Sequence, residues 1–202
     1  IVTAFGKFRN RGEIRMVLGA FRAWDEERKM LLAPRLYPFS RRNNYGKNFI
    51  KRWASRIGYY LLMPLLNRMF KLQAGANDEL IDNCDLPYYM AASDIILIQR
   101  KDMLNSANIP LAFLFHKVAI GPDTGNMGEL LNNTGNPTFC PDNKADIIRA
   151  LKEARQMVAC GKGELNYQYA MENMSIRKIG KMYVEIYRNL NNRLYPHSYQ
   201  QS

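Results

Sequence analysis

The sequence predicts one α/β domain in which a parallel β-sheet is covered by helices on both faces, a doubly wound arrangement. Short runs of apolar residues alternate with segments of helical periodicity along most of the chain. Continuous apolar runs are typical of strands buried on both faces, as in a parallel sheet between helical layers. The 202 residues, 47% of them hydrophobic, are enough to bury one core. We therefore expect one domain at residues 1–190 and a polar, frayed tail at 191–202.

The first residues predict a strand, a loop and a helix, and a second strand follows. Residues 1–5 are apolar or β-branched and end at Gly6, and apolar residues recur with helical spacing from Glu13 onward. Residues 30–33 form another apolar run. It ends at Pro34, because proline has no backbone N–H with which to continue a strand ladder.

The second half of the chain continues this alternation. Residues 95–98 and 118–121 are continuous apolar runs, and the segments around them have helical patterns. Pro110 is tolerated in the first turn of a helix, and Gly161 suits a helix C-cap. We expect strands at 94–98, 118–121 and 137–139, and helices at 86–92, 110–115, 144–160, 164–172 and 175–190.

Residues 41–71 interrupt this pattern with a segment that is both basic and aromatic. One interpretation is an amphipathic helix or helix pair, broken near Gly58 or Pro64, whose apolar side packs on the sheet. The other is a surface that lies on anionic lipid, with lysines and arginines at the headgroups. The two interpretations are compatible if different parts of the segment do each job.

The charge of the chain indicates an anionic partner. Lysine and arginine total 29 against 18 acidic residues, a formal net charge of +11. No run approaches the ~20 apolar residues of a membrane span, and no signal peptide is recognisable, so we expect a cytoplasmic protein. The 3 cysteines lack the spacing of metal ligands or of a disulfide framework, and we expect no bound metal and no cofactor.

The loop after the first expected strand carries a basic motif between two glycines. Lys7, Arg9 and Arg11 lie between Gly6 and Gly12. In parallel sheets, ligands bind at the carboxyl ends of the strands. Glycine lets backbone approach a ligand, a helix N-terminus offers free N–H groups, and basic side chains add charge, so a diphosphate suits this loop. The motif is neither a Walker loop nor the three-glycine dinucleotide pattern, and a merely solvated basic loop is the alternative.

Motifs of the second half add a family resemblance. A short helix ends in Ala92-Ser93-Asp94 before a strand, the loop Asn105-Ser106-Ala107-Asn108 follows that strand, and a glycine-rich loop at 125–129 follows the next. Their order and spacing resemble the C-terminal domain of retaining GT-B glycosyltransferases, the glycosyl transferases group 1 family, and segment 166–187 resembles its final helices. The resemblance covers most of the chain and implies a Rossmann-like fold, the C-terminal half of a GT-B architecture.

The resemblance also implies roles for individual residues. The loop that begins at Gly6 would hold the nucleotide diphosphate, which Lys7 or Arg9, together with Arg11, would neutralise as it leaves. Many family members bind the ribose through a glutamate where this chain has Leu111. The other residues that the resemblance places at the donor are Asn105, Ser106, Ala107 and Asn108 at the phosphates, and Asn126 and Glu129 near the sugar or ribose.

By this resemblance the chain binds a UDP- or GDP-linked sugar and transfers the sugar, without a metal, to a saccharide or lipid-linked acceptor in cell-surface polysaccharide synthesis. We expect it to lack the N-terminal, acceptor-binding domain and to be a weak catalyst alone, and its basic segment 41–71 would bring it to the inner face of a membrane. A nucleic-acid-binding module is one alternative, although the sequence contains no recognised nucleic-acid motif. A non-catalytic interaction domain that kept the fold is the other.

Overall fold

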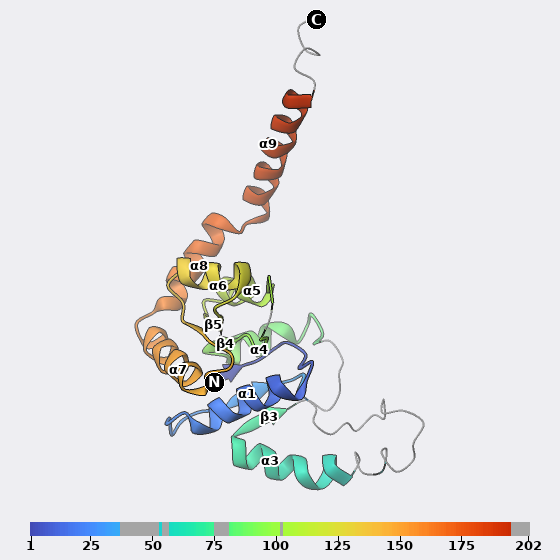
Figure 1. Cartoon of the computed structure of the whole chain (residues 1–202), viewed down its shortest axis with the longest axis vertical. Helices are drawn as coiled ribbons and strands as arrows, with labels where there is room; N and C mark the ends of the chain where they lie inside the picture. The colour runs from blue at the N-terminus through green and yellow to red at the C-terminus, as the bar shows by residue number, and fades with distance from the viewer. Residues whose placement is uncertain (37–52, 54–56, 75–80, 102, 195–202) are drawn as a thin grey trace, which may run out of the picture.

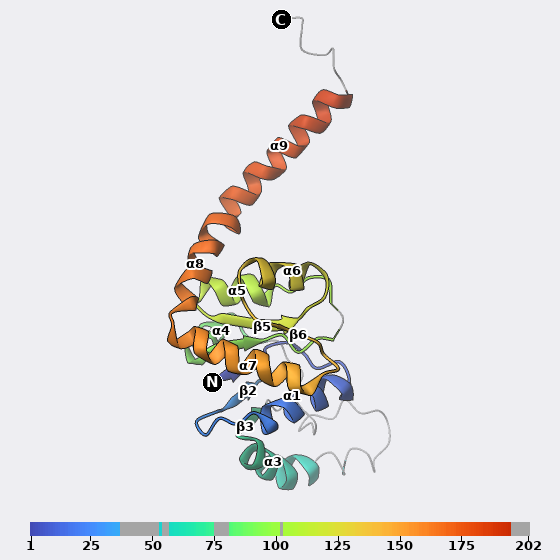
Figure 2. The ribbon, with the colours of Figure 1, turned by 60° about the vertical axis from the view of Figure 1, so that its left-hand side comes forward.

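A computed structural model describes residues 1–36, 53, 57–74, 81–101 and 103–194 (Figure 1). Within these residues the chain forms a six-stranded parallel sheet with the strand order β3-β2-β1-β4-β5-β6. Helices cover both faces of the sheet, which confirms the predicted α/β fold (Figure 2). Residues 41–52 and 54–56, most of the basic part of segment 41–71, lie outside the described residues. The lipid interpretation of that segment therefore stays a prediction.

The strands are short, and every strand that the sequence predicts is present. Five of the six correspond to strands that the sequence predicts. The strands are β1 Val2–Thr3, β2 Leu31–Ala33, β3 Leu72–Ala74, β4 Ile95–Leu97, β5 Val118–Pro122 and β6 Thr138–Phe139.

The edge strand β3 is a strand that the sequence analysis missed. Leu72 pairs with Leu31, and Ala74 with Ala33, so β3 extends the sheet beyond β2. Its three residues include a glutamine and follow the basic segment directly, so they form no recognisable apolar run. Pairing with β2, and not local sequence, makes this segment a strand.

The sheet is buried on both faces, as its apolar strands predict. Ile95 and Leu97 of β4 belong to one core cluster, whereas Ile96, which points to the opposite face, belongs to the other. Phe21 and Leu151 fill the first core, and Phe113 the second. Side chains alternate between the faces of a strand, so a central strand such as β4 supplies both cores only because its consecutive residues are all apolar.

The two cores are closed by separate sets of helices. In Figure 2, α7 and α1 lie on one side of the sheet and α5 and α6 on the other. Gly161, with a φ of +75°, separates α7 from α8 as the expected cap residue. The first set is α1 Arg11–Ala23 and α7 Lys144–Ala159, and the second is α4 Leu86–Ala92, α5 Asn108–Leu114, α6 Gly125–Asn133 and α8 Lys162–Asn173.

Residues 58–70 are helical and run through Pro64 without a break, whereas residues 54–56, next to the other expected break near Gly58, lie outside the described residues. A π-helical turn, Gly58–Leu62, leads directly into α3, Met63–Phe70, which packs against β3 and α1. Pro64 lies in the first turn of α3, where proline is tolerated. Tyr60, Leu61 and Leu65 are 58%, 69% and 52% exposed. The segment therefore does pack beside the sheet, as one interpretation held, but much of its apolar side stays uncovered.

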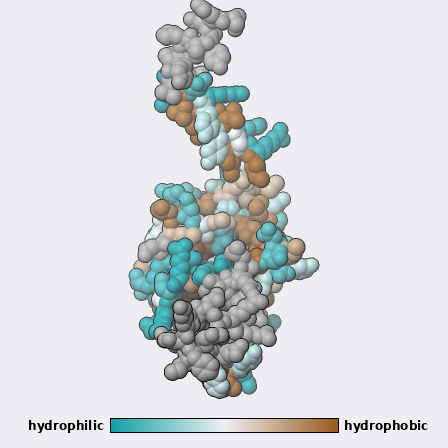
Figure 3. Space-filling view, turned by 90° about the vertical axis from the view of Figure 1, so that its right-hand side faces the viewer, coloured by the Kyte–Doolittle hydropathy of each residue, from teal (hydrophilic) through white to brown (hydrophobic). Residues whose placement is uncertain are grey.

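The last helix, α9 Ile176–Leu194, projects away from the rest of the domain (Figures 1 and 2). The helix continues to Leu194, so the first four residues of the tail that was expected to fray from 191 are helical. Once a helix has formed, each added residue contributes a further hydrogen bond, which favours this extension. None of the described helices is both long and apolar enough to cross a membrane. One side of α9 is an apolar stripe, visible in Figure 3, whose residues are 41–91% exposed: Ile176, Ile179, Met182, Tyr183, Ile186, Tyr187 and Leu190.

The exposed apolar stripe of α9 is expected to promote self-association of the protein. Replacing Ile179 and Ile186 with glutamate is expected to reduce self-association and the binding of a hydrophobic dye, because a contiguous exposed apolar patch promotes both. Stability should change by no more than ~0.5 kcal/mol, the usual range for surface substitutions. Sedimentation and thermal denaturation test this, with Lys181→Glu on the polar side of α9 as the control. A large loss of stability would show instead that the stripe packs within the domain.

Candidate functional site

The strand order reverses beside β1, and this reversal locates the candidate site. From β1 the chain builds the sheet outward through β2 and β3, and then returns to place β4 on the other side of β1. In open α/β sheets, ligands bind outside the carboxyl ends of the strands at such a switch point. The loops that leave β1 and β4 meet there. These are the basic loop at residues 6–10 and the loop at residues 98–107.

The structure shows what approaches Gly6 closely. A β-carbon at Gly6 would lie 2.0 Å from Nε2 of Gln99, which is buried and donates to the backbone oxygen of Lys7 at 3.4 Å. Gly6 therefore makes room for the side chain of Gln99, and not for a ligand as the sequence predicts. Phe8 is buried in the first core and anchors the loop between Lys7 and Arg9.

The first helix starts at Arg11, two residues earlier than the sequence predicts. Asn10 has extended backbone and caps the helix, because its side-chain oxygen accepts a hydrogen bond from the N–H of Glu13 at 2.9 Å. The Glu13 carboxylate in turn accepts the N–H of Arg9 at 2.7 Å. The spacing Asn10-x-x-Glu13 is a capping pattern that the sequence contains, and it could have revealed this start.

The structure adds two basic residues to the site that the sequence analysis did not single out. Arg100 and Lys101 follow β4, and both reach toward the first turn of α1. Arg100 is paired with Glu13, and Lys101 is paired with Asp142 in the loop after β6, close to Gly12. In the sequence these two residues lie about ninety residues from the basic loop, and nothing there connects them with it. Their position shortly after a predicted strand is the one sequence feature that could have indicated a role in the site.

The basic side chains of the first loop differ in exposure. Arg9 and Arg11 are exposed, and Lys7 is half-buried. Arg11 is the first residue of α1 and Gly12 the second, so the free N–H end of the helix lies beside these cations. The arrangement combines positive side chains with the N-terminal end of a helix, which suits an anionic group.

The loops after β4 and β5 are tied together. Met127 donates its N–H to the backbone oxygen of Leu104 at 3.1 Å, and a β-carbon at Gly125, which has a φ of +57°, would lie about 3.0 Å from backbone atoms of Met103 and Leu104. This contact brings the 105–108 loop next to the start of α6, where Asn126 is exposed. Two motifs that the resemblance assigns to one ligand thus lie side by side.

Individual residues of these motifs have different environments. Asn105, Ala107 and Glu129 are exposed, whereas Asn108 is half-buried. The hydroxyl of Ser106 accepts the N–H of Asn108 at 3.3 Å, at the start of α5. Leu111 packs against the second core and, as an apolar residue, offers no hydrogen bond to a ribose.

Thr124 stands at the same edge of the sheet with an unsatisfied hydroxyl. It is the N-cap residue of α6, yet its side chain makes no capping hydrogen bond. Its Oγ1 atom is buried and has no hydrogen-bond partner in the described part of the chain. Buried hydroxyl groups are usually hydrogen-bonded, so this oxygen is available to a ligand or to water.

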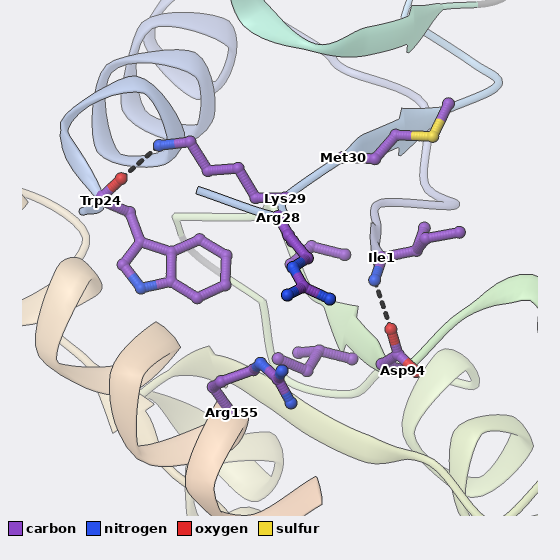
Figure 4. Close-up of a pocket in the computed structure, with 9 residues that line it drawn as sticks. Ile1, Trp24, Arg28, Lys29, Met30, Asp94 and Arg155 are labelled. Atoms are coloured by element: carbon purple, nitrogen blue, oxygen red, sulfur yellow. Dashed lines mark hydrogen bonds and ion pairs between the residues drawn. The ribbon is translucent and has the colours of Figure 1, made fainter. Parts of the chain in front are cut away.

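A cavity of about 180 Å³ lies at the opposite edge of the sheet, at the amino ends of β1, β2 and β4 (Figure 4). Lys29, which lines it, serves the fold. The ammonium of Lys29 donates to the backbone oxygens of Phe21, at 2.7 Å, and of Trp24, and so closes the end of α1. Burial, together with the nearby ammonium of Lys71, lowers the pKa of Lys29. This cavity is therefore not the predicted site.

Comparisons with known proteins support the fold. The sequence matches no family model and no curated protein. Three solved structures are similar to nearly the whole chain. A sucrose-phosphate synthase from Thermosynechococcus elongatus has 16% identity and a TM-score of 0.65, and the match covers 94% of this chain and 45% of that one. A glycosyltransferase from Rickettsia africae (14% identity, TM-score 0.66) and Anabaena HepE in complex with UDP (14% identity, TM-score 0.65) each match 93% of this chain, and 47% and 48% of their own chains. The chain spans about half the length of these proteins, and its fold is the α/β fold of one half of such glycosyltransferases.

Proposed function

We propose that this chain is the donor-binding domain of a GT-B-type glycosyltransferase and that it holds the diphosphate of a sugar nucleotide between the loops after β1 and β4. One observation carries the proposal: the basic loop, the free N–H end of α1 and two further cations after β4 meet at the switch point of the sheet. The fold shared with the glycosyltransferase from Rickettsia africae and with HepE, which was solved in complex with UDP, supports it.

The chemistry of sugar transfer explains why such a site is useful. When the bond between sugar and diphosphate breaks, negative charge develops on the leaving phosphate. Cations and N–H groups that are already in position stabilise this charge without reorganising, which lowers the barrier. We assign this task to Arg11 and Lys7, with Arg9 as a further contact on the same loop.

The rest of the donor lies along the edge toward α6. The loop at 105–108 contacts the phosphates, and Asn126 and Glu129 lie near the sugar or ribose. The contact between Met127 and Leu104 supports this assignment, because it joins the two loops into one surface. The free hydroxyl of Thr124 lies at the same edge.

The acceptor is a saccharide or a lipid-linked saccharide, in the synthesis of a cell-surface polysaccharide, and it binds a second domain. The chain matches only 45–48% of the neighbouring structures, which supports a second domain in the complete enzyme. The apolar stripe of α9 offers that domain a docking face. A cytoplasmic enzyme held at the inner membrane face by 41–71 fits a lipid-linked acceptor. Donor binding needs neither cofactor nor metal.

Calorimetric titration with UDP, GDP, uridine and a single-stranded oligonucleotide tests donor binding. We expect saturable binding of UDP or GDP in the micromolar to millimolar range and much weaker binding of uridine, because most of the contacts are to the diphosphate. Tight, strongly salt-dependent binding of the oligonucleotide would favour the nucleic-acid-binding alternative. Binding of none of the four would favour a domain that kept the fold for protein interactions.

A further inference from the structure

The charge at the start of α1 is not uniformly positive. Glu13 carries a carboxylate in the first turn and is only 3% exposed. A buried charge is costly unless it is paired and hydrogen-bonded. Glu13 has such partners: its carboxylate accepts the N–H of Arg9, and Nη1 of Arg100 lies 3.3 Å from each carboxylate oxygen.

Glu13 shapes the backbone of the basic loop. Its hydrogen bond to the N–H of Arg9, and that of its own N–H to Asn10, fix the loop where it enters the helix. A carboxylate is also favourable at the positive end of the helix dipole. The same position is unfavourable for ligand binding, because a carboxylate there repels a second anion such as a diphosphate.

Arg100 removes this conflict. Its guanidinium faces the Glu13 carboxylate, and the two side chains are only 11% and 4% exposed, so water screens the pair weakly. The pair is neutral overall, so the Glu13 carboxylate no longer sets a net negative charge beside the basic loop. Gln99 donates a hydrogen bond to the backbone oxygen of Lys7 in the basic loop. Lys101 forms an ion pair with Asp142 in the loop after β6. Gln99 and Arg100, two consecutive residues after β4, thus hold the loop after β1, and Lys101 lies beside Gly12.

We infer that Arg100 is a positioning residue of the diphosphate site, which acts through Glu13: it cancels the carboxylate charge at the end of α1 and holds Glu13 where it fixes the loop. The inference rests on the proposed function, because it concerns the same site. It predicts that the charge balance between Arg100 and Glu13, and not the presence of either residue alone, sets the affinity for a diphosphate.

Four variants test this by calorimetry with UDP and inorganic pyrophosphate. Arg100→Met should weaken the binding of both by about tenfold or more, because the carboxylate of Glu13 then faces the ligand. Glu13→Gln should not weaken it, because the amide still accepts the N–H of Arg9. The double variant should recover affinity to within about threefold of the wild type, since neither charge remains. Arg155→Met, which removes an exposed cation at the opposite edge, controls for net charge.

The pattern separates positioning from a merely structural role, and thermal denaturation of each variant accompanies the titrations. A double variant that binds as weakly as Arg100→Met would overturn the inference, as would an Arg100→Met variant that binds like Arg155→Met. If Arg100→Met does not fold, Glu13→Gln decides: a clear loss of pyrophosphate affinity in this folded variant overturns the inference. A wild-type chain that binds neither ligand would refute the proposed function itself, and this inference with it.

Discussion

Replacing Arg11 with alanine is expected to weaken the binding of UDP by about 1.5–3 kcal/mol, roughly 10- to 150-fold, the range of a charge-assisted hydrogen bond. Arg11 is the first residue of α1 and is exposed at the switch point of the sheet. It therefore lies at the N-terminal end of the helix, where the dipole favours an anion. Calorimetry with purified variants gives the affinity directly.

Two controls make the result specific. Uridine, which lacks the phosphates, should bind the Arg11→Ala variant as it binds the wild type. Arg15→Ala removes the same charge one turn further along the exposed side of α1, and it should leave UDP affinity within about twofold, because exposed charges are screened by salt. Equal losses for UDP and uridine, or for Arg11 and Arg15, would show that Arg11 is not a phosphate ligand.

Replacing Gly163 with alanine is expected to destabilise the fold by about 3 kcal/mol, at the upper end of the range for overpacking. A β-carbon there would lie 2.0 Å from the backbone oxygen of His116. That backbone cannot easily move, because the N–H of His116 bonds to Phe113, the N–H of Lys117 bonds to Ala112, and His116 already has a φ of +56°. For a chain of this length the melting temperature should fall by roughly 6–12 °C.

Gly19 provides the matched control for this substitution. It lies in α1, and a β-carbon there would meet nothing within 4 Å. Gly19→Ala should therefore raise stability, by up to ~1 kcal/mol, because alanine has the higher helix propensity. Differential scanning calorimetry of both variants measures the contrast. If Gly163→Ala were as stable as Gly19→Ala, α8 would not pack on the end of α5 as closely as the structure shows.

Several elements could be predicted from the sequence because their signals are local. The helix α4 has the predicted bounds, 86–92, since Asp85 and Pro87 mark its start and the strand of β4 follows at once. The apolar runs of β4 and β5 required burial on both faces, and the two cores supply it. The basic loop after β1 was also recognisable, because its cations are neighbours in the sequence.

Other features depend on contacts between distant segments, and no local pattern encodes them. The strand β3 exists because its three residues pair with β2. The neighbours of the basic loop, Gln99 and Arg100, lie about ninety residues away and reach it only because β4 inserts beside β1. Gly6 and Arg11 could therefore be assigned to a ligand site from the sequence, whereas Gln99 and Arg100, which contact the loop and Glu13, could not.

By itself, the sequence determined that this protein is a parallel α/β domain with a basic, glycine-containing loop at the end of its first strand. Local periodicity and apolar runs carry that information, because helices and buried strands differ in which residues must be apolar. The tertiary structure alone decided which loops meet at the switch point and how the charge of Glu13 is cancelled there. The strand order and the buried ion pair both bring together residues that are far apart in the sequence. They are therefore set by the packing of the whole chain and not by any local pattern.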